Sequence, residues 1–177
     1  MAEPQFVVFP AGPTDADALA WVHVSAWRET YRDLLPDAFL ARMSEAAHAR
    51  RFARALGRPG LDEVTLAAAD RFDILGYAQG GPSRRPVPGE AEVSTLYLVR
   101  AAQGFGLGRR LLAGTARALA ARGATSLMIS VLRDNHPARR FYEHLGGEAE
   151  TPRQERGPGG ALLFEVTYRW ADIRAIT

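Results

Sequence analysis

Hydrophobic positions follow a helical spacing in the first part of the chain. From Thr14 to about Asp33, apolar residues recur every three or four positions and therefore fall on one face of a helix. Thr14 followed by Asp17 three residues later fits a capping box, which predicts that the helix begins there. The residues on the apolar face are Ala20, Val24, Trp27, Tyr31 and Leu34.

Short β-rich runs predict the strands, and the clearest pair flanks a turn at residues 70–73 as a hairpin. The expected strands cover residues 5–9, 63–68, 74–79, 92–99, 126–132 and 161–170. Polar or Gly/Pro-rich loops are expected at residues 80–89 and 151–160. Further helices are expected from Pro36 to near Gly57, from Gly106 to about Arg122, and from Pro137 to Gly146.

The order of these elements predicts one domain of mixed α and β structure. A length of 177 residues fits a single domain, since chains split into separate cores mainly beyond ~250 residues. Neither an internal repeat nor a linker between two cores is visible. Near the middle of the chain a strand, a Gly-rich turn and a helix follow one another, and this unit carries the main chemical signal.

Composition excludes several classes of function. The net charge of +2 comes from 22 basic and 20 acidic residues, which is too balanced to indicate nucleic-acid binding. The chain has neither Lys nor Cys, which excludes lysine catalysis, a P-loop, disulfides, thiolate metal sites and a Cys nucleophile. The four histidines, His23, His48, His136 and His144, lack metal-ligand spacing, so we expect no metal.

The N-terminus predicts no export signal. Residues 1–5 contain no basic region followed by an apolar core. The longest apolar runs are far shorter than the ~20 residues that span a bilayer. We therefore expect a cytoplasmic protein that binds neither a membrane nor nucleic acid.

The stretch from Gln103 to Gly108 follows the strongest strand and opens a helix. A helix start presents unpaired N–H groups and a partial positive charge, and its three glycines let an anion approach the backbone. A purely structural strand-to-helix turn is the alternative. Two other phosphate-binding motifs fail, because a Rossmann fingerprint needs glycine where Arg109 stands and a P-loop needs Lys.

Two motifs stand in order along the second half of the chain. The first is Gln103-x-x-Gly106-x-Gly108, and the second is Asn135-x-x-Ala138-x-x-x-Tyr142-x-x-x-Gly146. They resemble the Q/R-x-x-G-x-G/A and N-x-x-A-x-x-x-Y-x-x-x-G signatures of the GNAT superfamily of N-acetyltransferases. Residues 27–31 and 34–36 also resemble the first-helix region of many members, so the resemblance covers nearly the whole chain.

The resemblance implies an α+β fold of three layers (αβα), as a single GNAT-type domain over residues 1–177. Its twisted, mostly antiparallel mixed sheet would be flanked by about four helices. The strands at residues 92–99 and 126–132 would splay apart and hold the pantetheine arm of acetyl-CoA, the acetyl donor. The residues assigned to the cofactor are Leu98, Val99, Arg100, Gln103, Gly104, Phe105, Gly106, Leu107, Gly108, Arg109 and Asn135, although Asn135 could instead simply cap a helix.

The resemblance also points to catalytic residues. Acetylation of an amine requires a base for the ammonium, whose pKa is near ~10, and an acid for the departing thiolate. Glu92 is the candidate base, with Glu90 as a rival and a solvated strand-end carboxylate as the alternative. Tyr142 is the candidate acid, because a phenol with a pKa of ~10 is protonated at pH 7; a core aromatic residue is the alternative.

Trp27 and Tyr31 are candidates for the acceptor site, since the resemblance implies that the first helices form its wall. An aromatic stripe at helical spacing is alternatively part of the core. We expect direct transfer of an acetyl group from acetyl-CoA to a primary amine of a small molecule or peptide. A transferase for another acyl-CoA and a catalytically idle acetyl-CoA sensor are the alternatives, and the sequence leaves open whether two copies form a homodimer.

Overall fold

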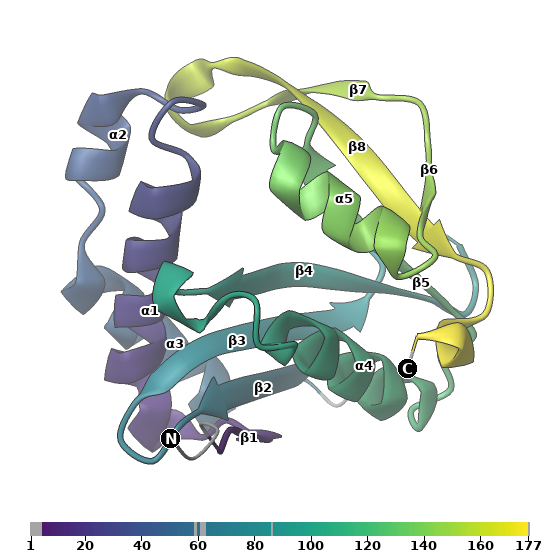
Figure 1. Cartoon of the computed structure of the whole chain (residues 1–177), viewed down its shortest axis with the longest axis horizontal. Coiled ribbons are helices and arrows are strands. Elements are labelled where there is room, and N and C mark those ends of the chain that lie inside the picture. Colours follow the sequence, from purple (N-terminus) through teal and green to yellow (C-terminus); the bar gives the residue numbers. More distant parts are fainter. Residues whose placement is uncertain (1–4, 59, 61–62, 86, 177) are drawn as a thin grey trace.

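The computed structural model describes residues 5–58, 60, 63–85 and 87–176. Within them one eight-stranded sheet runs in the order β1-β2-β3-β4-β5-β8-β6, with β7 paired to β8 (Figure 1). The strands are β1 Val7–Pro10, β2 Val64–Ala69, β3 Ile74–Pro82, β4 Glu90–Leu98, β5 Ser126–Leu132, β6 Glu148–Ala149, β7 Arg153–Arg156 and β8 Leu162–Trp170. Residues 1–4, on which the expectation of no export signal partly rests, lie outside the described residues.

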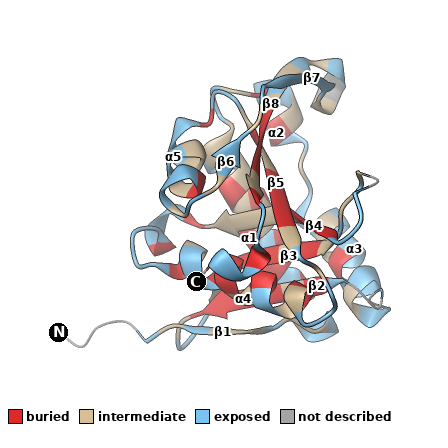
Figure 2. Cartoon of the chain, turned by 90° about the vertical axis from the view of Figure 1, so that its right-hand side faces the viewer, coloured by how far each residue is buried: buried red, intermediate tan, exposed pale blue. Residues whose placement is uncertain are grey.

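Helices cover both faces of the sheet, which confirms the mixed α and β fold (Figure 1). They are α1 Ala16–Thr30, α2 Asp37–Ala41, α3 Glu45–Gly57, α4 Leu107–Ala120 and α5 His136–His144. On one face, the Tyr77 ring of β3 contacts His23 of α1 and Phe52 of α3. On the other face, a Cβ on Gly80 would meet Leu119 of α4 at 2.9 Å. Figure 2 shows buried residues along the sheet and on the inner sides of the helices.

The strands β4 and β5 are parallel, whereas the other described pairs are antiparallel. Three residue pairs join them: Glu90 with Ser126, Ala91 with Leu127, and Glu92 with Met128. Beyond these pairs β4 continues to Leu98 and β5 to Leu132 without pairing to each other. The two strands therefore splay apart, as the resemblance implies.

A β-bulge in β4 changes which side chains share a face. The register with β3 skips Ser94, which is an extra residue between the paired Val93 and Thr95. Because side chains alternate along a strand, the extra residue places Glu92 on the same face as Thr95. Strict alternation in the sequence would have put these two side chains on opposite faces.

The capping box expected at Thr14 is wrong. Thr14 lies inside a short 3-10 turn over Pro13–Asp15, and α1 begins directly after it. Asp15 uses its carboxylate to accept a hydrogen bond from the Gly12 N–H at 2.8 Å. The acidic side chain therefore stabilises the turn that leads into the helix.

The second predicted helix is divided in two. The helix α2 ends at Ala41, and α3 begins at Glu45 after Ser44. The Ser44 side chain accepts a hydrogen bond from the Ala47 N–H at 3.3 Å. Because such a cap satisfies an N–H that the first helical turn leaves unpaired, Ser44 starts a new helix.

Both predicted loops contain strand residues. The loop expected at residues 80–89 begins later, because β3 continues to Pro82, which pairs with Ala91. The loop expected at residues 151–160 contains β7, whose four residues pair with the first half of β8. Strand formation depends on the neighbouring strand as much as on local composition, so polar and glycine-rich sequence concealed these pairings.

Candidate functional site

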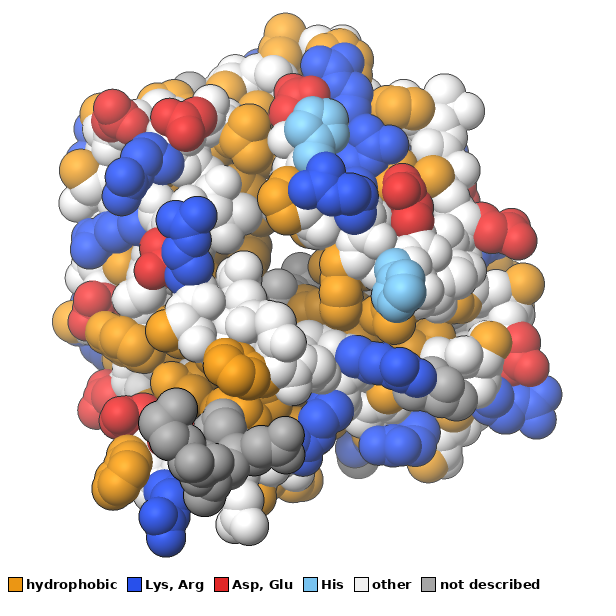
Figure 3. All heavy atoms as spheres, viewed as in Figure 1, with side chains coloured by type: hydrophobic (Ala, Val, Ile, Leu, Met, Phe, Trp, Pro, Cys, Tyr) orange, Lys and Arg blue, Asp and Glu red, His pale blue; other side chains and the backbone are white. Residues whose placement is uncertain are grey.

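A cleft of about 700 Å³ occupies the opening between the splayed strands. Its walls come from the end of α1, the outer half of β4, the loop before α4, the start of α4, the middle of β5 and the start of α5. Figure 3 shows the molecule hollowed between the α1 side and α5. Segments far apart in the sequence therefore meet at one cavity.

The outer edge of β4 directs backbone groups into this cleft. The Val99 N–H donates to the Leu75 carbonyl of β3 at 3.0 Å. In an antiparallel ladder, residues that bond to a neighbouring strand alternate with residues whose polar groups point away from it. Leu96 and Leu98 therefore direct their N–H and C=O groups toward β5, with which they form no described pair.

Of the three residues predicted at the end of this strand, Leu98 alone directs its N–H into the cleft. Val99 is buried and does not line the cleft, and its N–H is bonded to Leu75. Arg100 lines the cleft, but its N–H donates to a carboxylate oxygen of Glu29 on α1 at 3.0 Å. Leu96, which was not predicted from the sequence, also directs its N–H into the cleft. Strand alternation could have identified it, because it lies two residues before Leu98.

Glycines shape the loop that precedes α4. Gly104 and Gly106 have φ angles of +85° and +74°, in the left-handed region that residues with a Cβ rarely adopt. Gly106 precedes α4 without a side-chain cap, so no side chain occupies the N–H groups of the first turn. Both glycines line the cleft, and a Cβ on either would meet no described atom within 4 Å. The space beside these two glycines is therefore open.

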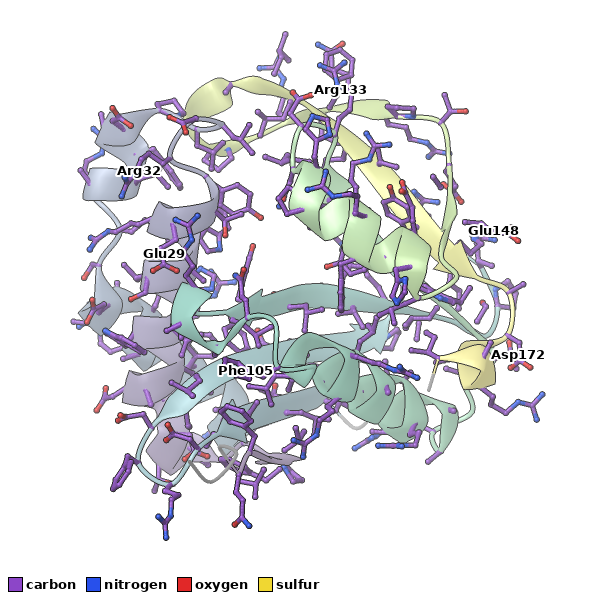
Figure 4. The ribbon with its side chains drawn as sticks, in the orientation of Figure 1. Glu29, Arg32, Phe105, Arg133, Glu148 and Asp172 are labelled. Atoms are coloured by element: carbon purple, nitrogen blue, oxygen red, sulfur yellow. The ribbon has the colours of Figure 1, made fainter. Side chains whose placement is uncertain are left out.

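The remaining residues of this loop differ in their surroundings. Gln103 lines the cleft, and its side-chain amide donates to the Leu98 carbonyl at 3.4 Å. Phe105 is 53% exposed, contacts Phe6 with ring centroids 5.6 Å apart, and does not line the cleft (Figure 4). Its side chain therefore lies outside the site for which the sequence analysis selected it.

The start of α4 packs closely against α5. A Cβ on Gly108 would lie 3.2 Å from the Phe141 ring, so the missing side chain lets the two helices approach. Leu107 is 1% exposed and belongs to the core, although it also forms part of the cleft wall. Gly108 therefore serves helix packing as well as access to the backbone.

Two basic residues, Arg100 and Arg109, line the cleft, and further basic residues lie on the neighbouring segments. Arg109 is exposed in the first turn of α4 and lines the cleft. Figure 3 shows further basic side chains over α5. The exposed basic residues in the first turn of α4 and in residues 133–144 are Arg109, Arg110, Arg133, His136, Arg140 and His144. Together with the start of α4 they favour an anionic ligand.

Asn135 occupies the start of α5. Its side-chain oxygen accepts a hydrogen bond from the Ala138 N–H at 3.3 Å, so the capping role is observed. Asn135 also lines the cleft. The cap uses the oxygen of the amide, and its nitrogen has no hydrogen bond to another described residue.

Tyr142 lies in the wall of the cleft and in the core at once. It is 5% exposed, and its ring contacts Phe141, Tyr168 and Trp170. No other described residue forms a hydrogen bond with its hydroxyl. Burial raises the pKa of the Tyr142 hydroxyl well above its ordinary value, so the group keeps its proton at neutral pH.

Glu92 lies outside the cleft. It is 4% exposed and lines a separate cavity of about 490 Å³. Arg84 Nε lies 3.1 Å from both carboxylate oxygens, and Arg84 Nη2 lies 2.5 Å from one of them. Burial acts to raise the pKa of Glu92, but the hydrogen bonds and charge of Arg84 outweigh it and hold the pKa below its ordinary value. A carboxylate in this ion pair is a weak proton acceptor.

Glu90, the alternative candidate for the base, also lies in an ion pair, with Arg169. Its side chain is buried, with one oxygen 2.5 Å from Arg169 and the other accepting from the Ser83 hydroxyl at 2.9 Å. Glu90 does not line the cleft. Both carboxylates predicted as bases therefore lie in ion pairs outside the cleft.

The two aromatic candidates for the acceptor site, Trp27 and Tyr31, have different surroundings. Tyr31 lines the cleft, and its hydroxyl lies 3.2 Å from that of Tyr97, a cleft residue that the sequence analysis missed. Trp27 does not line the cleft, and it packs against Tyr31, His23 and Phe39. Trp27 is half-buried against these rings and lies outside the residues that line the cleft, whereas Tyr31 lines it.

Two features are absent from the described residues. No three or more His, Asp or Glu residues among them come together as a group that could hold a metal ion. None of the helices in that part of the chain combines the length and apolar character needed to cross a membrane.

The chain is similar to known acetyltransferases along most of its length. The model of the "Acetyltransferase (GNAT) family" matches residues 20–147. A curated relative, "Uncharacterized N-acetyltransferase YuaI" of Bacillus subtilis (strain 168), is 29% identical over 163 residues, which are 92% of this chain and 91% of the relative.

Solved structures share the fold. The PaiA N-acetyltransferase of Thermoplasma acidophilum, in complex with coenzyme A, has a TM-score of 0.70 and 18% identity, over 94% of this chain and 99% of its own. The structure of yncA from Salmonella typhimurium, with its cofactor acetyl-CoA, has a TM-score of 0.71 and 20% identity, over 94% of both chains. At these identities the likeness establishes the fold.

Proposed function

Because the chain belongs to the acetyltransferase (GNAT) family, we propose that it transfers an acetyl group from acetyl-CoA directly to a primary amine of a small molecule or peptide. One observation carries this proposal: a single cleft joins an uncapped helix start, the unpaired edge of β4 and the Tyr142 hydroxyl. These three features meet the three needs of a bound acyl-CoA, which are an anion site, hydrogen-bonding groups along the arm and a proton donor.

The residues present fit acetyl-CoA. The N–H groups after Gly106 and the positive end of α4 suit its pyrophosphate, and the open space at Gly104 and Gly106 lets phosphate oxygens reach the backbone. The polar backbone groups of Leu96 and Leu98 suit the amide-rich arm. When bound, acetyl-CoA supplies an acetyl group on an activated thioester. A family relative solved with acetyl-CoA and another solved with coenzyme A support this donor.

The chain's own side chains supply the proton chemistry. The Tyr142 hydroxyl holds a proton at the cleft, where it can pass to a departing thiolate. The prediction that Glu92 accepts the proton of the amine needs an additional step. Arg84 holds that carboxylate, so Glu92 could act only after the ion pair opens.

Release of coenzyme A from acetyl-CoA, measured with a panel of acceptors, tests the proposal. Alkylamines, polyamines, amino acids, peptides and aminoglycosides are compared with alcohols of the same carbon skeleton as matched controls. We expect at least one class of amine to accelerate release and its alcohol to have no effect. If the chain binds acetyl-CoA and no amine accelerates release, the idle sensor is the better description.

The oligomeric state and the location in the cell stay predictions. A homodimer is tested by size-exclusion chromatography with light scattering on the full chain. A cytoplasmic location is tested by fractionation of cells that produce it.

A further inference from the structure

A group of charged residues lies on the side of the sheet opposite α5. On β8, Tyr168 and Trp170 contact Tyr142 of α5, so the residues that alternate with them face the other side. The residues on that other side are Glu165, Thr167 and Arg169. Arg85 donates to the Thr167 hydroxyl there at 2.8 Å, which shows that the connection between β3 and β4 reaches this face.

Three carboxylates on this side are each paired with arginine. The N···O distances are 2.5 Å for Glu90 with Arg169, 2.8 Å for Glu150 with Arg85, and 2.5 Å for Glu92 with Arg84. Glu165 differs, because it forms neither an ion pair nor a side-chain hydrogen bond with any other described residue. It is also half-buried. Arg153 is its neighbour across the strand pair but forms no ion pair with it. A half-buried carboxylate with no paired cation is stabilised by a cation that comes close to it, so this position favours a positively charged ligand.

Glu165 lies at the open end of the splay. It pairs with Leu132, the last residue of β5, whereas β5 meets β4 only at the opposite end. Glu165 is not itself among the residues that line the cleft, but Ser130 lines it, and the Ser130 hydroxyl lies 3.1 Å from that of Thr167, two residues along the same face of β8 from Glu165. The cleft therefore opens to the side of the sheet on which Glu165 lies. Burial raises the pKa of the Tyr31 hydroxyl and the charge of Glu165 adds to that rise, while the hydrogen bond with Tyr97 lowers it.

The surroundings of Glu165 weaken it as an acid. Burial raises the pKa of its carboxyl and the charge of Glu155 adds to the rise; Arg84 opposes it, and Glu92 adds to it. The charged and titratable groups around it are Arg84 and Glu92 from the β4 side, Arg153 and Glu155 from β7, and Tyr31, which directly follows α1. Since Arg84 is held by Glu92, its charge compensates Glu165 only in part, and the net result is a better proton acceptor than an ordinary Glu.

We propose that Glu165 binds the ammonium group of the acceptor and accepts the proton that its nitrogen must lose before acetylation. This inference rests on the proposed transfer to an amine, and it defines the acceptor as an alkylammonium ion that enters from the β8 side. The geometry gives Glu165 the role that the sequence analysis predicted for Glu92.

The proton and electron balance is simple. One N–H bond of the ammonium breaks, its electron pair stays on nitrogen, and the proton passes to a Glu165 oxygen. The nitrogen then forms a bond to the acetyl carbon and loses a second N–H proton to solvent, while the bond between that carbon and sulfur breaks with its electron pair on sulfur. The Tyr142 hydroxyl gives a proton to the sulfur, and solvent returns both side chains to their starting protonation.

Carboxyl ¹³C NMR of the full chain, labelled at glutamate, tests the binding step without measuring activity. The Glu165 signal is assigned by its loss in Glu165→Gln. We expect Glu165 to titrate at a higher pH than an ordinary Glu, and n-butylammonium to lower that pKa because a bound cation favours the carboxylate. The control n-butanol should leave it unchanged. A Glu165 titration that is identical with and without n-butylammonium overturns the proposal.

Kinetics test the proton transfer with an amine that the acceptor panel identifies. We expect Glu165→Gln to lower kcat/KM by ~10²–10⁴-fold near neutral pH, the range for a general base. The loss should shrink at high pH, where the amine is already neutral. Glu165→Asp should recover part of the rate, and the exposed Glu148→Gln should match the parent protein. If Glu92→Gln carries the pH-dependent loss and Glu165→Gln does not, the assignment to Glu165 is wrong.

The two proposals fail in different ways. If the parent chain acetylates no amine, the proposed function fails, whatever the NMR titration gives. If the parent chain acetylates an amine and folded Glu165→Gln retains the parent pH profile, acetyl transfer stands and the role of Glu165 is overturned. Far-UV circular dichroism of each variant confirms that the comparison is made on folded protein.

Discussion

At the scale of single residues, Tyr142 combines a buried ring with a hydroxyl that no other described side chain engages. Replacing it by Phe removes one oxygen and keeps the ring packing. If that hydroxyl protonates the thiolate, Tyr142→Phe should lower kcat and kcat/KM together by about a hundredfold or more. The melting temperature should hardly change, because no described hydrogen bond is lost.

Tyr168→Phe is the matched control. Its hydroxyl donates to Glu143 at 2.6 Å and accepts from Arg139 at 3.0 Å, and it does not line the cleft. This variant should lose roughly 1–2 kcal/mol of stability and keep its kcat. If Tyr142→Phe instead raises only KM for acetyl-CoA, its hydroxyl binds the donor and is not the acid.

Glu92 should contribute stability that depends on pH. Because Arg84 holds its pKa below the ordinary value, the carboxylate stabilises the fold above the unfolded-state pKa of ~4.3, and this stability is lost as pH falls through the folded-state pKa. Glu92→Gln should therefore cost about 1 kcal/mol at pH 7, since Arg84 is largely exposed, and much less near pH 3. Urea unfolding at both pH values measures this.

The exposed Glu148 of β6 provides the comparison for that experiment (Figure 4). Glu148→Gln should leave the free energy of unfolding unchanged at either pH. An equal loss for Glu92→Gln at pH 7 and pH 3 would show that packing, not charge, explains the effect.

The motif residues could be predicted from the sequence better than the residues around them. Gly104, Gly106 and Tyr142 line one cleft, because their local spacing sets the loop and the helix that carry them. The partners of Glu92 could not be predicted in this way. Its ion pair with Arg84 depends on the connection between β3 and β4. The face of the sheet on which its side chain lies depends on the bulge at Ser94. Contacts made by distant segments leave no local pattern.

At the scale of elements, the loop before α4 offers a matched pair of glycines. Gly106 and Gly123 both have positive φ, and a Cβ on either would meet no described atom within 4 Å, but Gly106 alone lines the cleft. Alanine at each position should therefore cost a similar ~1–2 kcal/mol of stability. We expect Gly106→Ala to weaken acetyl-CoA binding at least tenfold and Gly123→Ala to leave it unchanged, as measured by calorimetry.

Equal affinities for these two variants would mean that the turn at Gly106 is only structural.

The strand β5 and the helix at Pro137 were predictable, because their apolar pattern and proline are local signals. The division at Ser44 and the strand β7 were not, because a side-chain cap and pairing with β8 outweigh composition.

At the scale of the whole molecule, the sheet consists of two parts joined by few strand pairs. One part holds β1 to β4, with α1, α3 and α4 against it, and the other holds β5 to β8 with α5 (Figure 1). Three pairs between β4 and β5 connect them along the sheet. The cleft has walls from both parts, so a ligand that fills it also bridges them.

Acetyl-CoA should therefore stabilise both parts, and not only the loop that holds its pyrophosphate. At a hundredfold excess over its dissociation constant, a ligand specific for the folded state adds ~2.7 kcal/mol, which for a chain of this size is a rise of roughly 5–11 °C in melting temperature. NAD and ATP offer similar phosphates but no acyl-pantetheine arm, so their effect should be much smaller.

Hydrogen exchange adds the spatial test: acetyl-CoA should slow exchange at Leu96 and Leu98 and also across α5 on the far side of the splay. Protection confined to the start of α4, or equal thermal shifts from all three compounds, would show that phosphate binding alone accounts for the effect and that the arm does not occupy the splay.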